Sequence, residues 1–269
     1  QHCNPQVTEY PVERLGGSKK VIAELKEEGV VDVRDIPAGR LTSVAQERVR
    51  RITAAGEPEL TPGAADALKA LSWPRYYLDF ETVSFAVPIW TGTRPYRAYP
   101  FQWSIHVERA GGDLGHHEYL ADGTDAPMRE CMERMIDAIG DTGPIMVYTS
   151  YEQSVINRMA RRFPDLGRPL EAIVDRLFDL YPLTRAHYYH PDMHGSWSIK
   201  KVLPTIAPEL DYQSVGEITE GGAADTAFRH LLDDELPDQR RTEIRQALLD
   251  YCKLDTLAMV KLAAFLARR

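Results

Sequence analysis

The chain contains 269 residues, of which 43% are hydrophobic and 27% are charged, and its formal net charge at pH 7 is −8. This length is enough for one large domain, or for one domain with an appendage, and the composition excludes a disordered chain and a membrane protein. No stretch approaches the roughly 20 apolar residues that cross a bilayer, and we expect no signal peptide. The negative charge does not favour a protein that coats nucleic acid, although net charge says little about one local groove.

Three cysteines, Cys3, Cys131 and Cys252, are scattered along the chain. An odd, scattered set argues against a disulfide framework and indicates a reducing compartment, so we expect a cytoplasmic protein. Cys131 and Cys252 lie in apolar helical patterns and are expected to pack in the core. The chain begins at Gln1 rather than at a methionine, so we expect a fragment of a longer protein.

Residues 1–72 predict a small helical lead-in, or a linker from a truncated upstream domain. Apolar spacing predicts an amphipathic helix over residues 18–25, with Ser18 as its N-cap. Two further helices are expected at residues 42–49 and 64–68.

Residues 73–269 predict the main domain, an α/β unit with a mixed sheet flanked by helices. Apolar and aromatic runs predict strands at residues 75–82, 101–107, 116–120 and 144–149. Helical spacing predicts helices at residues 127–139, 151–163, 198–206 and 242–266, the last being one long helix or two stacked ones. Residues 173–180 carry mixed signals.

Asp79 and Glu81 are the sharpest local feature of the sequence. They end a strand that begins with buried-type residues, and residues two apart on a strand point to the same face. Two carboxylates held together raise each other's pKa unless a cation neutralises them, and hard oxygen ligands suit Mg²⁺ or Mn²⁺. Taken alone, such a pair of acids is also typical of a strand end that is exposed to solvent and binds no metal.

Two further acidic positions extend this pattern. Glu152 opens a helix just after the apolar strand at residues 144–149, where an ordinary acid also benefits from the helix dipole. Asp255 lies in an apolar helical stretch and shares a helix face with Tyr251, four residues earlier. A buried acid there requires a partner or a metal, whereas a surface acid requires neither.

Together these positions resemble the DEDD superfamily of 3′–5′ exonucleases, over residues 73–269. Asp79-Phe80-Glu81-Thr82 resembles the superfamily's first motif, and Tyr251-x-x-x-Asp255 resembles the tyrosine form of its last motif. Residues 148–152 resemble the middle motif but depart from it, because Thr149 replaces the usual Asn and Glu152 the usual Asp. The departure leaves Asp179, and less favourably Asp175, as rivals to Glu152 for the third metal ligand.

The resemblance implies a ribonuclease-H-like fold and a two-metal hydrolysis of phosphodiester bonds in DNA or RNA. The two cations, Mg²⁺ or Mn²⁺, would be held by Asp79, Glu81, Glu152 and Asp255, and Tyr251 would orient the attacking water. Candidate substrate contacts are Thr82, Tyr188, Tyr189 and Lys200. The partner would be nucleic acid, with single-stranded ends favoured, and no membrane partner is expected.

Three other segments, at residues 100–104, 188–191 and 195–200, resemble an uncharacterised bacterial family, the domain-of-unknown-function family 2779. That resemblance implies a RecB-like nuclease domain upstream in the full-length chain, with Cys3 as the last cysteine of its iron–sulfur site.

Two alternatives remain open from the sequence alone. One is a non-catalytic module that binds nucleic acid or protein and keeps the fold. The other is a metal-dependent phosphoesterase that acts on a substrate other than nucleic acid, because the walls of a cleft choose the substrate.

Overall fold

The computed structural model describes residues 8–123, 126–210 and 221–268. Cys3 and its expected iron–sulfur role lie outside these residues. A mixed sheet forms the centre of the main part, with strands in the order β4-β3-β2-β5-β6. These strands are β2 (Arg75–Val83), β3 (Tyr99–Glu108), β4 (Leu114–Leu120), β5 (Ile145–Val147) and β6 (Leu177–Asp179). Strands β4, β3 and β2 are antiparallel, whereas β2, β5 and β6 run parallel.

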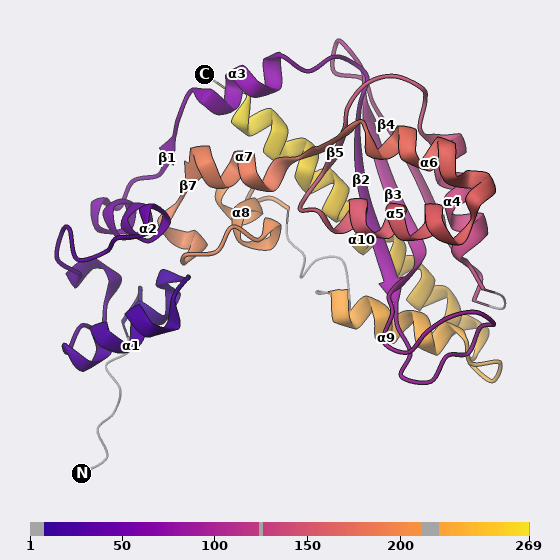
Figure 1. The fold of residues 1–269 in the computed structure, drawn as a ribbon, viewed down its shortest axis with the longest axis horizontal. Helices are drawn as coiled ribbons and strands as arrows, with labels where there is room; N and C mark the ends of the chain where they lie inside the picture. The colour runs from indigo at the N-terminus through magenta and orange to yellow at the C-terminus, as the bar shows by residue number, and fades with distance from the viewer. Residues whose placement is uncertain (1–7, 124–125, 211–220, 269) are drawn as a thin grey trace.

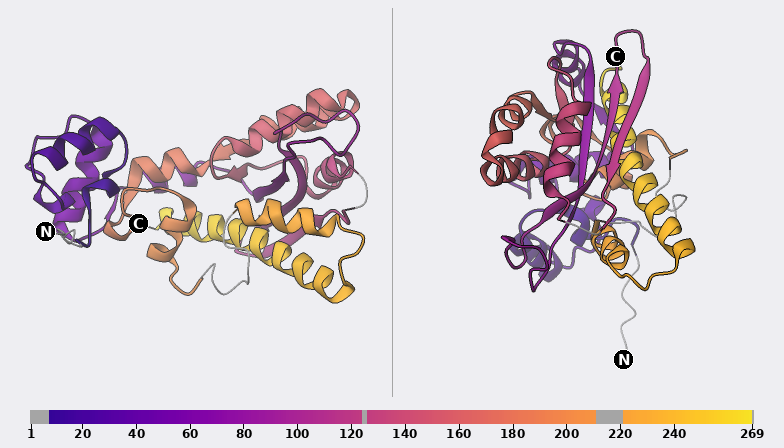
Figure 2. Two further views of the ribbon diagram at one scale, coloured as in Figure 1. Left: turned by 90° about the horizontal axis from the view of Figure 1, so that it is seen from below. Right: turned by 90° about the vertical axis from the view of Figure 1, so that its right-hand side faces the viewer.

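Helices cover both faces of this sheet, as the right-hand view of Figure 2 shows. One face packs against α4 (Met128–Ala138), α5 (Tyr151–Arg162) and α6 (Gly167–Val174). The other face packs against α9 (Gly221–Leu231) and α10 (Asp238–Leu266). The mixed α/β sheet expected from the sequence is therefore confirmed. The long C-terminal pattern forms one helix, and the mixed signals at residues 173–180 resolve into the end of α6 followed by β6.

Residues 8–55 form a helical lobe at one end of the molecule (Figures 1 and 2). Its helices are α1 (Lys19–Glu27) and α2 (Val44–Ala55), and β1 (Glu59–Leu60) and α3 (Gly63–Lys69) lead from it to the main part. Strand β1 pairs antiparallel with β7 (Tyr188–Tyr189), which follows α7 (Leu180–His187) and precedes α8 (Ile199–Ile206). The lobe is therefore joined to the main part by backbone hydrogen bonds.

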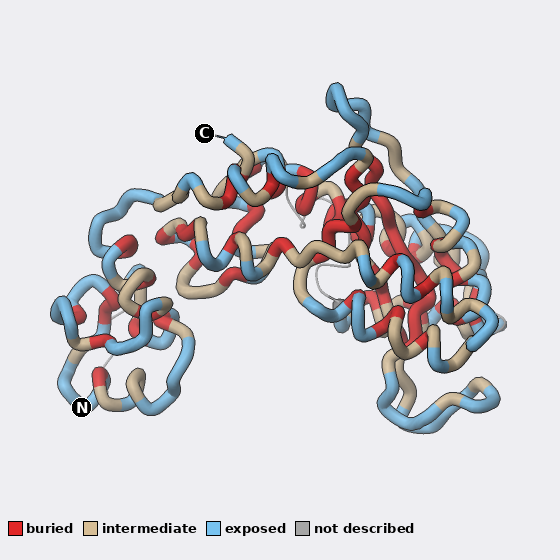
Figure 3. The backbone as a smooth tube through the Cα atoms, turned by 45° about the horizontal axis from the view of Figure 1, so that its top comes forward, coloured by how far each residue is buried: buried red, intermediate tan, exposed pale blue. Residues whose placement is uncertain are grey.

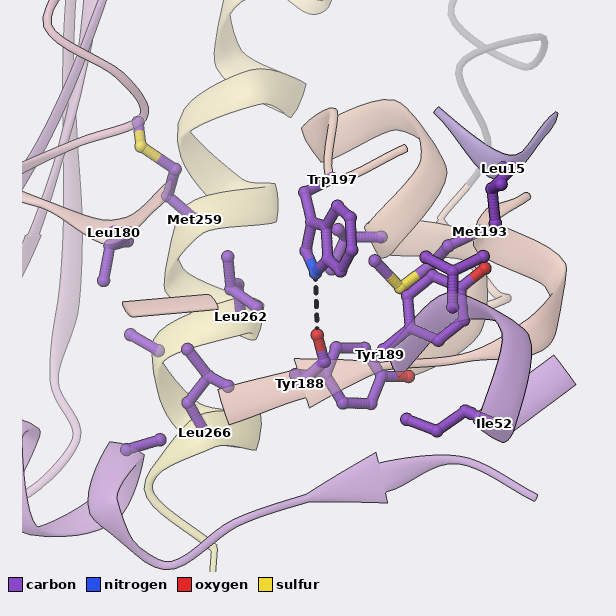
Figure 4. Close-up of a cluster of buried hydrophobic side chains, with 14 of the residues drawn as sticks. Leu15, Ile52, Leu180, Tyr188, Tyr189, Met193, Trp197, Met259, Leu262 and Leu266 are labelled. Atoms are coloured by element: carbon purple, nitrogen blue, oxygen red, sulfur yellow. Dashed lines mark hydrogen bonds between the residues drawn. The ribbon is translucent and has the colours of Figure 1, made fainter. Parts of the chain in front are cut away.

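Buried side chains also join the two parts. One hydrophobic cluster contains residues of the lobe, such as Leu15 and Ile52, together with Tyr188 and the C-terminal half of α10 (Figure 4). Within it, the Trp197 indole nitrogen donates to the Tyr188 carbonyl at 2.8 Å. Figure 3 shows buried segments both in the sheet and at this junction. No helix among the described residues is long and apolar enough to cross a membrane.

Gly195 makes the closest backbone approach at this junction. Its φ is +73°, and a Cβ atom there would lie 1.8 Å from the Arg14 carbonyl oxygen. We expect Gly195→Ala to lower the free energy of unfolding by more than about 2 kcal/mol. The alanine would have to adopt a left-handed backbone conformation, and its Cβ atom would overlap the Arg14 backbone. Gly29→Ala is the matched control, since Gly29 has φ +81° and nothing within 4 Å of its added Cβ. Urea unfolding of both variants measures the difference, and equal losses would contradict this close packing.

Candidate functional site

Strand β2 presents its two carboxylates to α10. Its even-numbered apolar residues, Tyr76, Leu78 and Phe80, pack with α4 to α6, whereas Tyr77 packs in the cluster shared with α10. Because side chains alternate across a strand, Asp79 and Glu81 lie on the α10 side with Tyr77. The alternation read from the sequence thus gives the direction of both carboxylates.

Helix α10 supplies the next two side chains. Tyr251 and Asp255 are four residues apart, so they share one helix face, and both are buried. Ligand oxygens of Asp79, Glu81 and Asp255 all lie within 4.8 Å of one another. Three carboxylates at this separation fit the oxygen donors that Mg²⁺ and Mn²⁺ prefer.

A cleft of about 380 Å³ opens at these carboxylates. It is lined by side chains from the second half of β2, from the start of α8 and from the middle of α10, together with Tyr148 and Tyr151. Figure 1 shows β2 and α10 running side by side through the main part. The site is therefore built mainly on two regular elements of the main part, β2 and α10.

Glu152 is positioned by the short connection between β5 and α5. Thr149 in this connection has φ +88°, a left-handed conformation that β-branched residues seldom adopt. Asp179 stabilises it, because its Oδ1 accepts from Thr149 N and also from Tyr181 N, both at 2.8 Å. Asp179 therefore caps α7 and holds the turn that aims Glu152.

Glu152 itself has a free ligand atom. Its side chain is buried, and its Oε2 has no hydrogen-bond partner among the described residues. An unsatisfied buried carboxylate oxygen is costly, so it calls for a partner that the protein chain does not supply. Oδ1 of Asp179, by contrast, already accepts two backbone hydrogen bonds. This contrast favours Glu152 over Asp179 as the fourth candidate ligand.

The four carboxylates disfavour one another's charge. Burial raises the pKa of Asp79 well above its usual value, and the other three carboxylates raise it further. Burial and Asp255 likewise raise the pKa of Glu81, although the Lys200 ammonium opposes them. Burial, with the charges of Asp179 and Asp255, raises the pKa of Glu152 to about 8, while a backbone hydrogen bond opposes the rise. The site therefore holds excess negative charge that cations would relieve.

Lys200 and Tyr251 form a pair inside the cleft. The Lys200 ammonium donates to the Tyr251 hydroxyl at 2.7 Å and lies 4.8 Å from the centre of its ring. Burial, followed by the charges of Asp255, Glu81 and Asp79, raises the pKa of Tyr251. The hydroxyl therefore remains protonated at neutral pH when only the protein groups act on it, and it can donate a hydrogen bond toward the carboxylates.

Thr82 also reaches the cleft, where its hydroxyl lies 2.5 Å from the Tyr151 hydroxyl. The sequence did not place Tyr151 at the site, and it predicted only that Cys252 packs in the core. The Cys252 thiol is buried and lies 3.8 Å from Asp79 Oδ2. Its position three residues before Asp255 on α10 was the available signal, since residues three apart on a helix are neighbours.

The expectation that Tyr188 and Tyr189 contact the substrate is wrong. Their side chains are 1% and 0% exposed and pack in the cluster shared with the N-terminal lobe. The Tyr188 hydroxyl lies 2.9 Å from Thr205 Oγ1, and the Tyr189 hydroxyl accepts from Gly195 N at 3.0 Å. A ring with no open face cannot stack on a base, so both tyrosines stabilise the fold.

Residues 76–198 match a family described as "Domain of unknown function (DUF2779)". The matched region runs from β2 to the residue before α8, so it contains Asp79, Glu81 and Glu152 but not Tyr251 or Asp255. The expected resemblance to that family is confirmed by this match. Its description assigns no activity.

A relative from Mycoplasma pneumoniae (strain ATCC 29342 / M129 / Subtype 1), described as "Uncharacterized protein MG366 homolog", is 26% identical over 217 residues. The alignment covers 71% of this chain and 32% of that protein, so the chain spans about a third of the relative's length. No solved structure matches the chain.

Proposed function

We propose that this protein is a metal-dependent nuclease that hydrolyses phosphodiester bonds, acting as a 3′–5′ exonuclease of the DEDD type. The observation that carries the proposal is the convergence of Asp79, Glu81 and Asp255 within 4.8 Å, on two elements far apart in the sequence. The buried, unpartnered Oε2 of Glu152 adds a fourth ligand atom whose charge interacts with theirs. The order β4-β3-β2-β5-β6, antiparallel on one side of β2 and parallel on the other, supports a ribonuclease-H-like fold.

The donor set fits two divalent cations held by Asp79, Glu81, Glu152 and Asp255. Bound there, Mg²⁺ or Mn²⁺ would lower the pKa of a water and stabilise charge on the phosphate. The residues of this chain hold and orient the reactants around that centre. The Tyr251 hydroxyl accepts from Lys200 and keeps its own proton to donate from one wall, and Lys200 would place a positive charge beside Glu81 and the developing negative charge of a phosphate.

The direct test is incubation of the protein with end-labelled DNA and RNA oligonucleotides in Mn²⁺, Mg²⁺ or EDTA. We expect mononucleotides to be released from the 3′ end with either cation, and no cleavage in EDTA. A small phosphodiester such as the p-nitrophenyl ester of thymidine 5′-monophosphate tests the chemistry apart from strand recognition. Full cleavage in EDTA, or no cleavage of any substrate together with no Mn²⁺ binding, would refute the proposal.

Tyr251→Phe separates a role in catalysis from a role in packing. The change keeps the ring and removes the hydroxyl, so we expect single-turnover cleavage to slow by a factor on the order of 10². Mn²⁺ binding should survive because the four carboxylates remain, whereas Asp255→Asn should weaken both Mn²⁺ binding and cleavage. Calorimetry with Mn²⁺ and single-turnover cleavage measure the two effects. Wild-type cleavage by Tyr251→Phe would make the tyrosine structural and remove the tyrosine subclass assignment.

A further inference from the structure

Two segments beside the cleft carry arginines and no carboxylate. The first segment, residues 83–98, ends β2 and connects it to β3. The second, residues 153–163, belongs to α5 and its C-cap. Neither segment contains Asp or Glu, although the whole chain has a net charge of −8. They contain five arginines, Arg94, Arg97, Arg158, Arg161 and Arg162. Such segregation of positive charge in an acidic chain indicates an anionic partner.

The two segments form one surface. Arg162 of α5 donates through Nη1 to the Gly92 carbonyl at 2.6 Å and through Nη2 to the Thr91 carbonyl at 3.2 Å. In Figure 1 the connection is the dark purple loop that follows the β2 arrowhead and extends beyond the sheet. Among the residues that the structure describes, none of the five arginines forms an ion pair with a carboxylate. No carboxylate among the described residues therefore neutralises their charge, although Arg162 already uses two donors to hold the connection.

Arg158 links this set to the cleft, because its charge interacts with that of Tyr151, a cleft residue. Its Nε and Nη2 atoms are buried and have no hydrogen-bond partner in the described part of the chain. Its charge interacts with Tyr151, which lines the cleft, and with Arg97 and Arg161. Donors left without acceptors in a cluster of like charge are stabilised by an anion with several oxygens, such as a phosphate.

Tyr96 completes the surface between Arg94 and Arg97. Its side chain is 79% exposed, and its φ of +54° places it in the left-handed region. That conformation costs about 1–2 kcal/mol for a residue other than glycine, and the exposed ring recovers little of this by packing. An exposed ring with a fixed backbone is suited to stacking on an unpaired base.

We propose that this arginine face binds the backbone of a single-stranded nucleic acid whose end lies in the carboxylate cleft. The inference rests on the proposed function, since it names the strand that the metal site would cleave. Without a metal, four carboxylates outweigh the Lys200 ammonium and repel a phosphodiester, so the affinity for the strand in EDTA has to come from positive charge outside the cleft. Arg97, Arg158 and Arg161 supply that charge, and Tyr96 contacts a base rather than the backbone.

The test is binding of a fluorescein-labelled dodecathymidylate, measured by anisotropy in EDTA over about 50–200 mM salt. The variant is Arg97→Gln combined with Arg161→Gln, because both side chains belong to exposed residues and their loss should not affect folding. The matched control is Arg109→Gln combined with Arg134→Gln, two exposed arginines on other elements. We expect the variant to bind roughly 10-fold more weakly than the control, with a salt slope smaller by about 1.4.

The outcomes separate this inference from the proposed function. Equal binding by variant and control, no binding by the wild-type protein, or equal competition by polyglutamate would overturn the arginine face. If the wild-type protein still hydrolyses the p-nitrophenyl ester with Mn²⁺, the metal-dependent phosphodiesterase stands without it. Strand binding that depends on Arg97 and Arg161, without hydrolysis of any substrate, would support the face and overturn the nuclease.

Tyr96→Asn tests the stacking role of the ring, because asparagine tolerates a positive φ. The variant should bind the strand more weakly without a change in the salt slope.

Discussion

Asp79→Asn is expected to reduce phosphodiester cleavage by a factor on the order of 10³ or more, while the protein stays folded. The substitution keeps the shape of the side chain but replaces a ligand oxygen and removes one negative charge. Burial and the neighbouring carboxylates already raise the pKa of Asp79, so the neutral amide removes a repulsion that the folded state carries. Urea unfolding in EDTA should therefore show unchanged or higher stability alongside the loss of activity.

The control for Asp79→Asn is Asp137→Asn, which makes the same charge change at an exposed position on α4. Single-turnover cleavage with Mn²⁺ compares the two variants, and calorimetry measures their affinity for the cation. Cleavage by Asp79→Asn at a rate close to that of Asp137→Asn would show that the carboxylate is not part of the catalytic centre. A collapse of stability in EDTA would instead show that Asp79 is structural.

The stability of the protein without divalent cations is expected to fall as pH rises. Burial and nearby charge raise the pKa of Glu152 from 4.5 to about 8, and they also raise those of Asp79 and Glu81. The folded state thus binds more protons than the unfolded state between the two pKa values, so the free energy of unfolding decreases with pH across that window. For Glu152 the window runs from about pH 4.5 to about pH 8.

Urea unfolding in EDTA at about pH 5.5 and about pH 8.5 measures this loss, which we expect to be on the order of 2 kcal/mol or more. Mn²⁺ at 100 times its dissociation constant should restore about 2.7 kcal/mol. At one fixed Mn²⁺ concentration the restoration should be larger at the higher pH, because ligands must lose their protons before they bind a metal. Glu152→Gln should flatten the pH dependence, whereas Glu130→Gln, on α4, should not. A stability in EDTA that rises over this window would contradict the proximity of these carboxylates.

Local periodicity was sufficient to predict which site residues share one face of a strand or a helix. Alternation along β2 predicts that Asp79 and Glu81 share a face, and the helical period predicts the same for Tyr251 and Asp255. Both relations hold within one element, so they need no knowledge of tertiary packing. That the two faces meet was expected only from the family resemblance, since spacing within one element does not place it against another.

The remaining features depend on contacts between distant segments. Strand β6 has only three residues, Leu177–Asp179, which is too short for alternation, and it pairs along the edge of β5. Tyr188 and Tyr189 are closed to solvent because the N-terminal lobe and α10 cover them, and no feature of their own sequence shows this. Arg158 likewise comes near Arg97 only when the β2–β3 connection folds against α5.

Helix α10 gives the molecule a mechanical property. At 1.5 Å per residue, its 29 residues form a rod about 43 Å long. Asp255 lies near its middle, and residues Met259 to Leu266 are anchored in the cluster shared with the N-terminal lobe. Because a continuous helix resists bending and compression, α10 joins the carboxylate site rigidly to the cluster shared with the N-terminal lobe.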